Sequence, residues 1–262
     1  MPFVAYNPLL MKLLEPRLLR FESVASTNTE VARLAQLGAE EGLAIVADEQ
    51  TAGRGRLQRS WSSPKGAGLY CSVLLRPAFA PDRWPLLTFV AALATGDALL
   101  EASEVKTDIK WPNDLLANER KICGILAEGI ETPTGRVVVV GIGINLTNEA
   151  FPSELANVAT SVAQEGRRPE REAILAALLK AVARWYALLH EPDGAEKIVA
   201  AWASRSSYAT GKMVQVTNGD EVLQGVTRGV ESDGALRLET TGGLQLIRAG
   251  DVTSVRPAKV NV

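Results

Sequence analysis

Three arginines and two glycines alternate in one segment, which reads Gln-Thr-Ala-Gly-Arg-Gly-Arg-Leu-Gln-Arg-Ser-Trp from Gln50 to Trp61. Glycines let backbone N–H groups approach an anion, and each arginine offers forked donors that suit a phosphate or carboxylate. The Trp61 ring suits stacking on a base or covering a ligand. The segment lacks the closing Gly-Lys-Ser/Thr of a Walker A motif, and a strand follows it rather than the helix of a Rossmann fingerprint. We interpret it as a mobile phosphate-binding loop; a solvated flexible loop is the alternative.

A second group of polar residues is the run Lys110-Trp111-Pro112-Asn113-Asp114. Lys110 ends an expected strand, and Pro112 stops the strand pairing. A lysine in this position neutralises charge that develops on a phosphate. A hairpin entry with solvated Lys and Asp side chains explains the same run equally well.

Glycines interrupt two apolar strands further along the chain. Lys121 heads the first, which contains Gly124, and the second contains Gly141 and Gly143 before Asn145. A glycine inside a strand costs stability and often marks the close approach of a ligand or another backbone. The alternative is an edge lysine beside a bulge in the first strand and a packing-driven bulge in the second.

The composition excludes several classes of protein. The 262 residues include 28 Lys+Arg and 30 Asp+Glu, so the net charge of −2 does not support a broad basic surface for nucleic acid. One His and two Cys cannot supply the four ligands of a structural zinc site. We interpret His190 as a helix C-terminal residue and Cys71 and Cys123 as inert core thiols. Any catalysis then depends on Lys, Arg, carboxylates, backbone dipoles or a bound ion.

The cysteine content and the length of the apolar runs also indicate where in the cell the protein is expected. Two cysteines and no secretory signal indicate a reducing cytoplasm. The longest apolar run, from Val137 to Leu146, is far shorter than the roughly 20 residues that a membrane helix needs.

Hydrophobic periodicity predicts the elements that position these residues. Thr27 and Glu30 have the spacing of a capping box at the start of the first helix. The short connections between residues 105 and 146 predict antiparallel hairpins rather than βαβ crossovers. The expected helices are 26–37, 83–102, 170–189 and 194–204, and the expected strands are 43–47, 69–75, 105–111, 115–116, 121–128 and 137–146.

From about Gly211 onward, the sequence pattern changes to short expected strands separated by turns. Asn218-Gly219 and Asp233-Gly234 are strong hairpin-turn dipeptides. They predict a small β-barrel packed on the main domain, which divides the chain into a domain of residues 1–208 and one of residues 209–262. The expected strands of the tail are 212–217, 222–230, 235–240, 244–247 and 252–256.

In order along the chain, these segments resemble the catalytic domain of biotin protein ligases: Ser26-Thr27-Asn28, Gly53–Arg56 with Trp61, Lys110–Asp114, Arg120-Lys121 with Gly124-Ile125-Leu126, and Gly141–Asn145. The tail, with Gly211-Lys212, Asp233–Leu236 and Ala249–Val252, resembles the SH3-like barrel of that family. The resemblance covers about residues 21 to 257. It implies an α+β fold: a mixed, largely antiparallel sheet with helices in a class II synthetase-like catalytic domain, plus the barrel.

The resemblance also implies an activity. Biotin and ATP, with Mg²⁺, give biotinyl-5′-adenylate, and a lysine of a biotin carboxyl carrier protein or carboxylase subunit then receives the biotin. We expect a cytoplasmic protein without a membrane partner from the cysteine content and the short apolar runs. The family often pairs through exposed sheet edges, which makes a homodimer one possible form, and the sequence does not show which edge is free. With only about twenty residues before the catalytic segment, we expect no N-terminal DNA-binding domain and no nucleic-acid partner.

Residues are carried over one by one from the resemblance. Lys110, Lys121, Arg54 and Arg56 are the implied catalytic residues. The implied biotin-binding residues are Ser26, Thr27, Asn28, Gln50, Gly53, Lys121 and Gly124. The implied ATP- or adenylate-binding residues are Arg54, Gly55, Arg56, Trp61, Lys110, Asn113, Asn145 and Arg256. The metal ligands are not implied, and Asp114 is a candidate for deprotonating the acceptor lysine by proximity only.

One position departs from the family pattern, because Gln58 stands where the arginine loop often has a third glycine. Glutamine does not match the φ range of glycine, so we expect the second half of the loop to close differently. Three other functions remain: a lipoate or octanoate transferase, a biotin or nucleotide sensor without catalysis, and a protein-interaction role for the barrel.

Overall fold

The structure is a computed structural model that describes residues 17–254, so Arg256 lies outside the described residues. A central sheet has the strand order β1-β2-β3-β7-β6-β5-β4. β1 and β2 pair in parallel, and the other neighbours are antiparallel, which confirms the mixed, largely antiparallel sheet. The strands are β1 (Leu18–Val24), β2 (Ala44–Gln50), β3 (Gly68–Leu75), β4 (Asp108–Lys110), β5 (Asp114–Ala117), β6 (Arg120–Thr132) and β7 (Gly135–Asn145).

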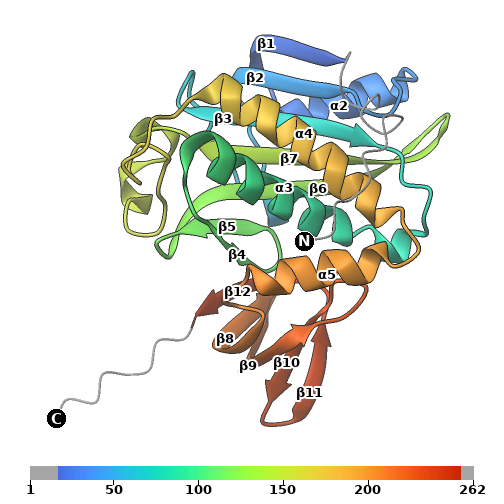
Figure 1. Cartoon of the computed structure of the whole chain (residues 1–262), viewed down its shortest axis with the longest axis vertical. Coiled ribbons are helices and arrows are strands. Elements are labelled where there is room, and N and C mark those ends of the chain that lie inside the picture. The colour runs from blue at the N-terminus through green and yellow to red at the C-terminus, as the bar shows by residue number, and fades with distance from the viewer. Residues whose placement is uncertain (1–16, 255–262) are drawn as a thin grey trace.

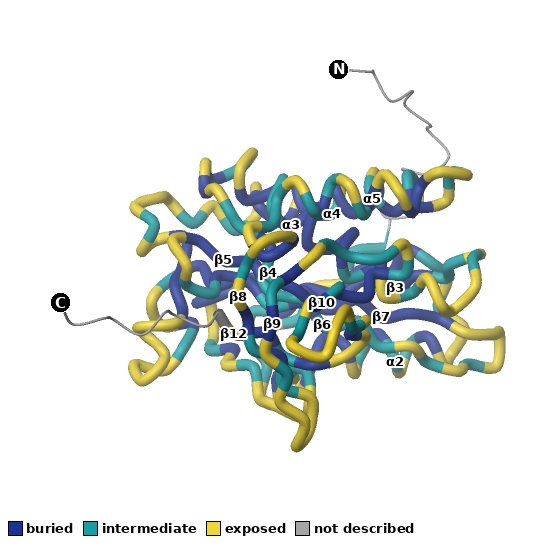
Figure 2. The backbone as a smooth tube through the Cα atoms, turned by 90° about the horizontal axis from the view of Figure 1, so that it is seen from below, coloured by how far each residue is buried: buried dark blue, intermediate teal, exposed yellow. Residues whose placement is uncertain are grey.

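Helices cover both faces of this sheet. Figures 1 and 2 show α3, α4 and α5 in one layer and α2 on the opposite face. The segment Pro81–Ser103, which includes α3, is long and apolar enough to cross a membrane, but 67% of its most apolar part is buried inside the protein, so we describe α3 as a core helix. The bounds are α2 (Thr27–Gln36), α3 (Leu86–Ser103), α4 (Arg171–Leu189) and α5 (Gly194–Ser204).

The core has two layers because side chains alternate along each strand. Ala44 and Val46 of β2 pack in the cluster that contains α3 and α4, whereas Ile45 packs in a separate cluster with Val31 and Ala35 of α2. Since α2 is short, no helix within residues 17–254 covers the rest of its face of the sheet. That free part is where the polar side chains and glycines gather.

A second, smaller sheet follows, with the antiparallel order β11-β10-β9-β8-β12. It contacts the central unit through the β9–β10 turn, where Trp111 Nε1 donates to the carbonyl oxygen of Gly234 at 3.0 Å. Figure 1 shows it below α5. The strands are β8 (Thr210–Asn218), β9 (Glu221–Val230), β10 (Leu236–Thr240), β11 (Gly243–Ile247) and β12 (Asp251–Ser254), which confirms the five short strands of the SH3-like tail.

Two local predictions need correction. Ser26 is the N-cap of α2 and no side-chain cap forms there; Thr27 instead donates its hydroxyl to Gln50 Oε1 at 3.0 Å, so the capping box was wrong. Sequence reasoning also missed β1, whose residues are mostly exposed or half-buried and carry Arg20 and Glu22. The strand expected at 105–111 is shortened to β4.

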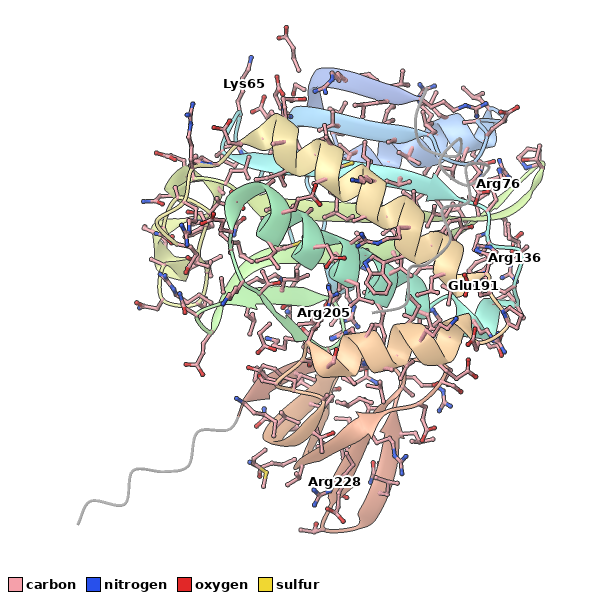
Figure 3. The ribbon with its side chains drawn as sticks, in the orientation of Figure 1. Lys65, Arg76, Arg136, Glu191, Arg205 and Arg228 are labelled. Carbon is pink, nitrogen blue, oxygen red and sulfur yellow. The ribbon has the colours of Figure 1, made fainter. Side chains whose placement is uncertain are left out.

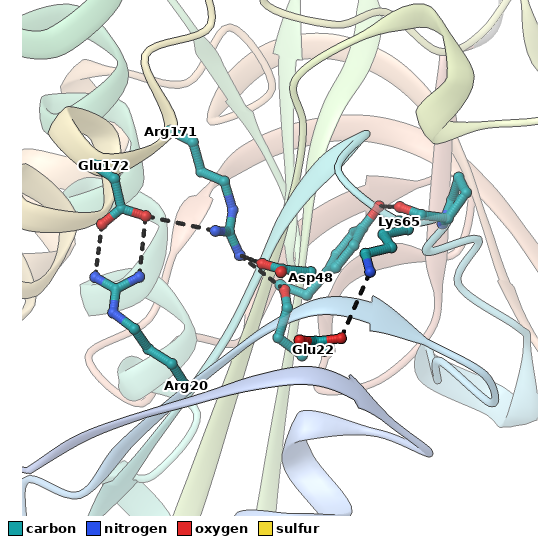
Figure 4. A network of polar contacts seen from close by, with 9 residues as sticks. Arg20, Glu22, Asp48, Lys65, Arg171 and Glu172 are labelled. Carbon is teal, nitrogen blue, oxygen red and sulfur yellow. Dashed lines mark hydrogen bonds and ion pairs between the residues drawn. The ribbon is translucent and has the colours of Figure 1, made fainter.

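Ion pairs hold the missed edge strand to the first turn of α4 (Figure 4). Arg20 donates twice to the Glu172 carboxylate, at 3.0 and 2.6 Å, and Arg171 pairs with Asp48 of β2 at 2.9 Å. The Arg20–Glu172 pair is exposed and contributes little, whereas the Arg171 side chain is half-buried. Charged side chains of this kind, Arg205 and Arg228 among them, cover the outside of the molecule (Figure 3).

The histidine and cysteine interpretations are confirmed. His190 is the C-cap of α4, and its ring packs on Phe79 and Tyr186. Cys71 and Cys123 are buried free thiols. Burial raises the pKa of Cys71 to about 12 and raises the pKa of Cys123 as well, so neither is a thiolate at neutral pH.

Candidate active site

A cavity of about 220 Å³ lies on the α2 face of the central sheet. Its walls come from the start of α2, the loop 51–61, the strands β4 to β7 and the first residues of β12. Residues from both sheets therefore meet around one space. Among the lining residues are Ser26, Thr27, Asn28, Gln50, Arg54, Gly55, Arg56, Trp61, Lys110, Asn113, Lys121 and Gly124.

Three glycines form the floor of the cavity. Because they have no side chains, the larger side chains of Trp61 and Asn28 can pack directly on them. A Cβ on Gly143 would lie 2.6 Å from Trp61 Nε1, and one on Gly124 would lie 2.9 Å from the same ring. A Cβ on Gly141 would lie 2.1 Å from Asn28 Oδ1. These glycines do mark a close approach, but by the protein's own Trp61 and Asn28 side chains; the approach of a ligand or another backbone stays a prediction.

Two lysines flank one carboxylate at the β4–β5–β6 end of the cavity. Lys121 Nζ lies 2.6 Å from Asp114 Oδ1, and Lys110 Nζ lies 3.8 Å from Asp114 Oδ2. The Lys121 ammonium also lies 5.3 Å from the centroid of the Trp61 ring. Two cations against one anion leave this end with a net positive charge, which suits a phosphate or carboxylate.

The opposite end is a network of neutral polar groups around the first turn of α2, and it reaches one charged group, the Glu128 carboxylate, to which Asn28 Nδ2 donates at 2.7 Å. The Thr27 backbone N–H donates to Gln50 Oε1 at 2.8 Å, and Gln50 Nε2 donates to Ser63 Oγ at 2.8 Å. The Ser72 hydroxyl lies 2.7 Å from Thr27 Oγ1 and 2.6 Å from Asn28 Oδ1. The hydroxyl and amide groups of this end can orient the polar head of a neutral ligand.

The arginine loop lies across the cavity and is anchored at both sides. Arg54 pairs with Glu128 of β6 at 2.8 Å. Arg59 pairs with Asp251 of β12 at 2.6 Å, and Arg56 lies 3.5 Å from the same carboxylate. The central sheet and the C-terminal sheet therefore both hold the loop.

Arg56 is the most enclosed of the three arginines. Its Nη1 donates to the carbonyl oxygen of Gly250 at 3.2 Å and lies 3.4 Å from Asn113 Oδ1. Burial lowers the pKa of Arg56 from its ordinary value, and the carboxylates of Asp251 and Asp114 oppose that shift. An arginine remains protonated at physiological pH, so Arg56 brings a positive charge to the cavity.

The backbone of the loop corrects one expectation. Gln58 has φ +59° and Leu57 has φ +53°, so both occupy the left-handed region that favours glycine. The prediction that glutamine would not match glycine's φ range was wrong here: Gln58 takes that conformation at a cost in strain of about 1 kcal/mol.

Three of the implied site residues lie outside the cavity lining or the described residues, and the roles of all the implied site residues remain predictions. Gly53 stands behind the cavity, where a Cβ would lie 2.4 Å from the carbonyl oxygen of Trp61. Asn145 is buried outside the lining and donates its amide to the carbonyl oxygen of Thr160 at 2.9 Å. Arg256 lies outside the described residues.

Sequence reasoning missed two acidic residues that hold the arginine loop, Glu128 and Asp251. The sequence spacing could have indicated Glu128, because a residue four positions after Gly124 faces the same side of β6. No such spacing indicates Asp251, since it reaches the loop only through the packing of the C-terminal sheet.

Comparisons with known proteins match both parts of the chain. The model of the Biotin/lipoate A/B protein ligase family matches residues 20–145, and that of the Biotin protein ligase C terminal domain matches residues 210–253. The bifunctional ligase/repressor BirA of Bacillus subtilis is 36% identical over 90% of this chain and 73% of its own length. The biotin–[acetyl-CoA-carboxylase] ligase of Paracoccus denitrificans is 38% identical over 87% of this chain and 96% of its own.

Solved structures agree with these matches. The biotin protein ligase of Aquifex aeolicus in complex with biotin and ATP superposes with a TM-score of 0.79 at 31% identity. The superposition covers 92% of this chain and all (100%) of the other. The similarity therefore includes the central sheet, its helices and the C-terminal sheet.

Proposed function

The chain belongs to the biotin protein ligase family, and on that premise we propose how the residues of its cavity activate and transfer biotin. The protein is an ATP-dependent ligase: it converts biotin and ATP to biotinyl-5′-AMP and transfers the biotin to a lysine of a carrier protein. The observation that supports the residue roles best is the pair of lysines, Lys110 and Lys121, on either side of Asp114.

In the first step a carboxylate oxygen of biotin attacks the α-phosphorus of ATP, and pyrophosphate leaves. Both reactants are anionic, so cations must offset their repulsion and stabilise the charge of the transition state. We assign this task to Lys110 and Lys121, whose ammonium groups Asp114 orients. Arg54 and Arg56, held over the cavity by the loop, bind the phosphates.

The neutral end of the cavity binds the head group of biotin. Ser26, Thr27 and Asn28 offer hydroxyl and amide groups there, and Gln50 fixes the first turn of α2. Trp61 covers the floor between the two ends, next to the nucleotide. The anchored loop excludes water, which protects the mixed anhydride from hydrolysis.

In the second step the acceptor lysine, as a neutral amine, attacks the carbonyl carbon of the anhydride, and AMP leaves. Both oxygens of Asp114 face a lysine ammonium, at 2.6 and 3.8 Å. Both carboxylate oxygens are therefore already engaged in ion pairs. We therefore propose that Asp114 orients the lysines rather than accepting the proton.

Magnesium accompanies the ATP. Within residues 17–254 no group of three or more His, Cys, Asp or Glu side chains is placed to hold a metal ion. The carboxylates at the cavity are already paired with cations. The residues therefore fit a magnesium ion that is held mainly by the nucleotide phosphates, where it offsets their charge.

The finer assignments follow from the same premise. We propose a ligase domain over residues 1–208 and an SH3-like domain over residues 209–262. We propose that the protein works in the cytoplasm, with a biotin carboxyl carrier protein as its partner. We also propose that it binds neither a membrane nor DNA. A gel-shift with operator DNA tests the last point. We also propose a homodimer through the outer edge of β1, which pairs with no other strand of residues 17–254. The edge of β4 is instead covered by the backbone of Arg205, whose carbonyl oxygen accepts the N–H of Ile109. A monomer in analytical ultracentrifugation contradicts it.

Biotin-dependent exchange of labelled pyrophosphate into ATP tests the function and the lysine role together. We expect exchange with biotin and none with lipoate, and a loss in kcat of about 10² to 10³ for Lys121→Ala. Lys65→Ala is the matched control, because Lys65 is an exposed lysine that faces Glu22 at 3.7 Å, away from the cavity. Exchange with lipoate indicates the related transferase, and binding of biotin without exchange indicates a sensor.

A further inference from the structure

Lys121 lies next to a one-residue irregularity in the pairing of β5 with β6. Leu115 is opposite Cys123, but the next residue of β5, Leu116, is opposite Lys121. Ile122 therefore has no partner of its own on β5. Such a β-bulge bends a strand locally and changes the direction of the neighbouring side chains.

The bulge places Lys121 on the same face of the sheet as Gly124. Residues three apart on a regular strand face opposite sides. Lys121 Nζ nevertheless lies 3.3 Å from the position that a Cβ on Gly124 would occupy. Without the extra residue, Lys121 would face the same side as Cys123, which packs in the apolar cluster with α3. The bulge is thus what directs the ammonium toward Asp114.

A distant segment supports the bulged backbone from its other side. The Lys121 N–H donates to the carbonyl oxygen of Val158 at 2.8 Å, and the Lys121 carbonyl oxygen accepts the N–H of Thr160 at 2.8 Å. These bonds form a parallel bridge centred on Ala159. Because β7 pairs with β6 only from Cys123 onward, this segment supplies the backbone partners that β7 does not.

Glu165 joins this segment to the turn that precedes β6. Its side chain is only 8% exposed. Its carboxylate accepts the Thr160 hydroxyl at 2.6 Å and the guanidinium of Arg120 at 3.3 Å, and it also accepts the Asn118 amide. A buried carboxylate with partners on two segments is costly to remove, because those donors lose their acceptor.

We propose that Glu165 is a positioning residue for Lys121: it fixes the segment 158–165 against the β5–β6 turn and so maintains the bulge that turns Lys121 into the cavity. This inference rests on the proposed role of Lys121 in adenylation. Glu165 is not part of the cavity lining, and its partners Asn118, Arg120 and Thr160 carry no proposed role in binding. Its effect on the reaction therefore passes through the segment 158–165, which bonds to the backbone of Lys121 and also accepts the Asn145 amide at the Thr160 carbonyl oxygen.

A double-mutant cycle on the full chain tests the inference, with biotin-dependent pyrophosphate exchange as the measurement. We expect Glu165→Ala to lower kcat about tenfold and to change the KM for biotin less than about twofold, because Lys121 acts on transition-state charge. In a Lys121→Ala background, we expect the same change to lower kcat less than about twofold, because the two residues act as one unit. Glu154→Ala, which removes an exposed carboxylate from the same region, is the matched control.

An equal loss in both backgrounds overturns the inference, because a merely structural role acts independently of Lys121. An unchanged kcat in Glu165→Ala overturns it too. If Glu165→Ala does not fold, Thr160→Val removes one donor to the same carboxylate, and we expect it to lower kcat about threefold in the wild-type background only. Pyrophosphate exchange by the wild type in the same assay tests the proposed function separately, because an inactive wild type contradicts that function. Losses in kcat that simply add in the double mutant contradict only the role of Glu165.

Discussion

Asp251 Oδ2, at the start of β12, lies 2.6 Å from Arg59 Nη2 in the arginine loop. The two residues are 192 positions apart in sequence: Asp251 begins a strand of the C-terminal sheet, whereas Arg59 lies in the loop between β2 and β3 of the central sheet. The same carboxylate lies 3.5 Å from Arg56, which also bonds to the backbone of Gly250. The C-terminal sheet thus contributes directly to holding the loop over the cavity.

Replacing Asp251 with asparagine should loosen the loop. Exposed ion pairs contribute up to about 1 kcal/mol each, so we expect free biotinyl-5′-AMP to escape about two- to tenfold faster. Trypsin should also cleave within 54–59 sooner. Asp233→Asn is the control, because Asp233 pairs with Arg248 of the same sheet at 3.0 Å and does not touch the loop. Equal release from both variants contradicts the anchoring role.

The left-handed backbone of Gln58 predicts opposite effects for two substitutions. Glycine adopts φ +59° freely, whereas a β-branched valine is strained there. We expect Gln58→Val to weaken binding of a non-hydrolysable adenylate analogue about tenfold, and Gln58→Gly to bind it within about threefold of the wild type. Calorimetry measures both affinities. Equal affinities for the two variants mean that Gln58 does not keep this conformation in the complex.

A methyl group on the cavity floor should displace Trp61. In Gly143→Ala the new Cβ would lie 2.6 Å from Trp61 Nε1, well inside van der Waals contact. We expect the KM for ATP to rise at least about tenfold and the stability to fall by about 1 to 3 kcal/mol. Gly242→Ala is the control, because its Cβ would meet only Thr240 Oγ1, at 3.7 Å. A normal KM in Gly143→Ala contradicts the contact between Trp61 and the nucleotide.

Local patterns in the sequence predicted most of the elements. The helix expected at 194–204 matches α5, and the turn dipeptides Asn218-Gly219 and Asp233-Gly234 lie between the strands that they were expected to join. Both signals are short-range, because periodicity and turn chemistry act over a few residues. β1 lacks such a signal: it is an edge strand with charged residues, fixed by its parallel pairing with β2 and by ion pairs to α4.

The site was predicted less completely, because part of its geometry is long-range. Residue type and spacing singled out the arginine loop, and the resemblance decided between the two interpretations of the Lys110–Asp114 segment; both line the cavity. The side of the sheet that Lys121 faces depends on the bulge at Ile122, which no local pattern revealed. Asp251 reaches the loop only through the packing of the two sheets, so no local spacing could have indicated it.

The charge pairing at the cavity leads to a prediction about magnesium. Asp114 faces two lysines, Asp251 faces two arginines, and Glu128 faces Arg54. A magnesium ion would have to displace these cations to bind the protein alone, whereas ATP supplies oxygen ligands of its own.

We therefore expect chelation by EDTA to abolish pyrophosphate exchange but to change the melting temperature of the ligand-free protein by less than about 1 °C, since an ion that does not bind the native state does not stabilise it. In the presence of ATP, magnesium should raise the melting temperature. Differential scanning calorimetry with and without nucleotide distinguishes the two cases. A clear rise with magnesium alone would show that the free protein has a metal site and that at least one of these carboxylates gives up its cation to form it.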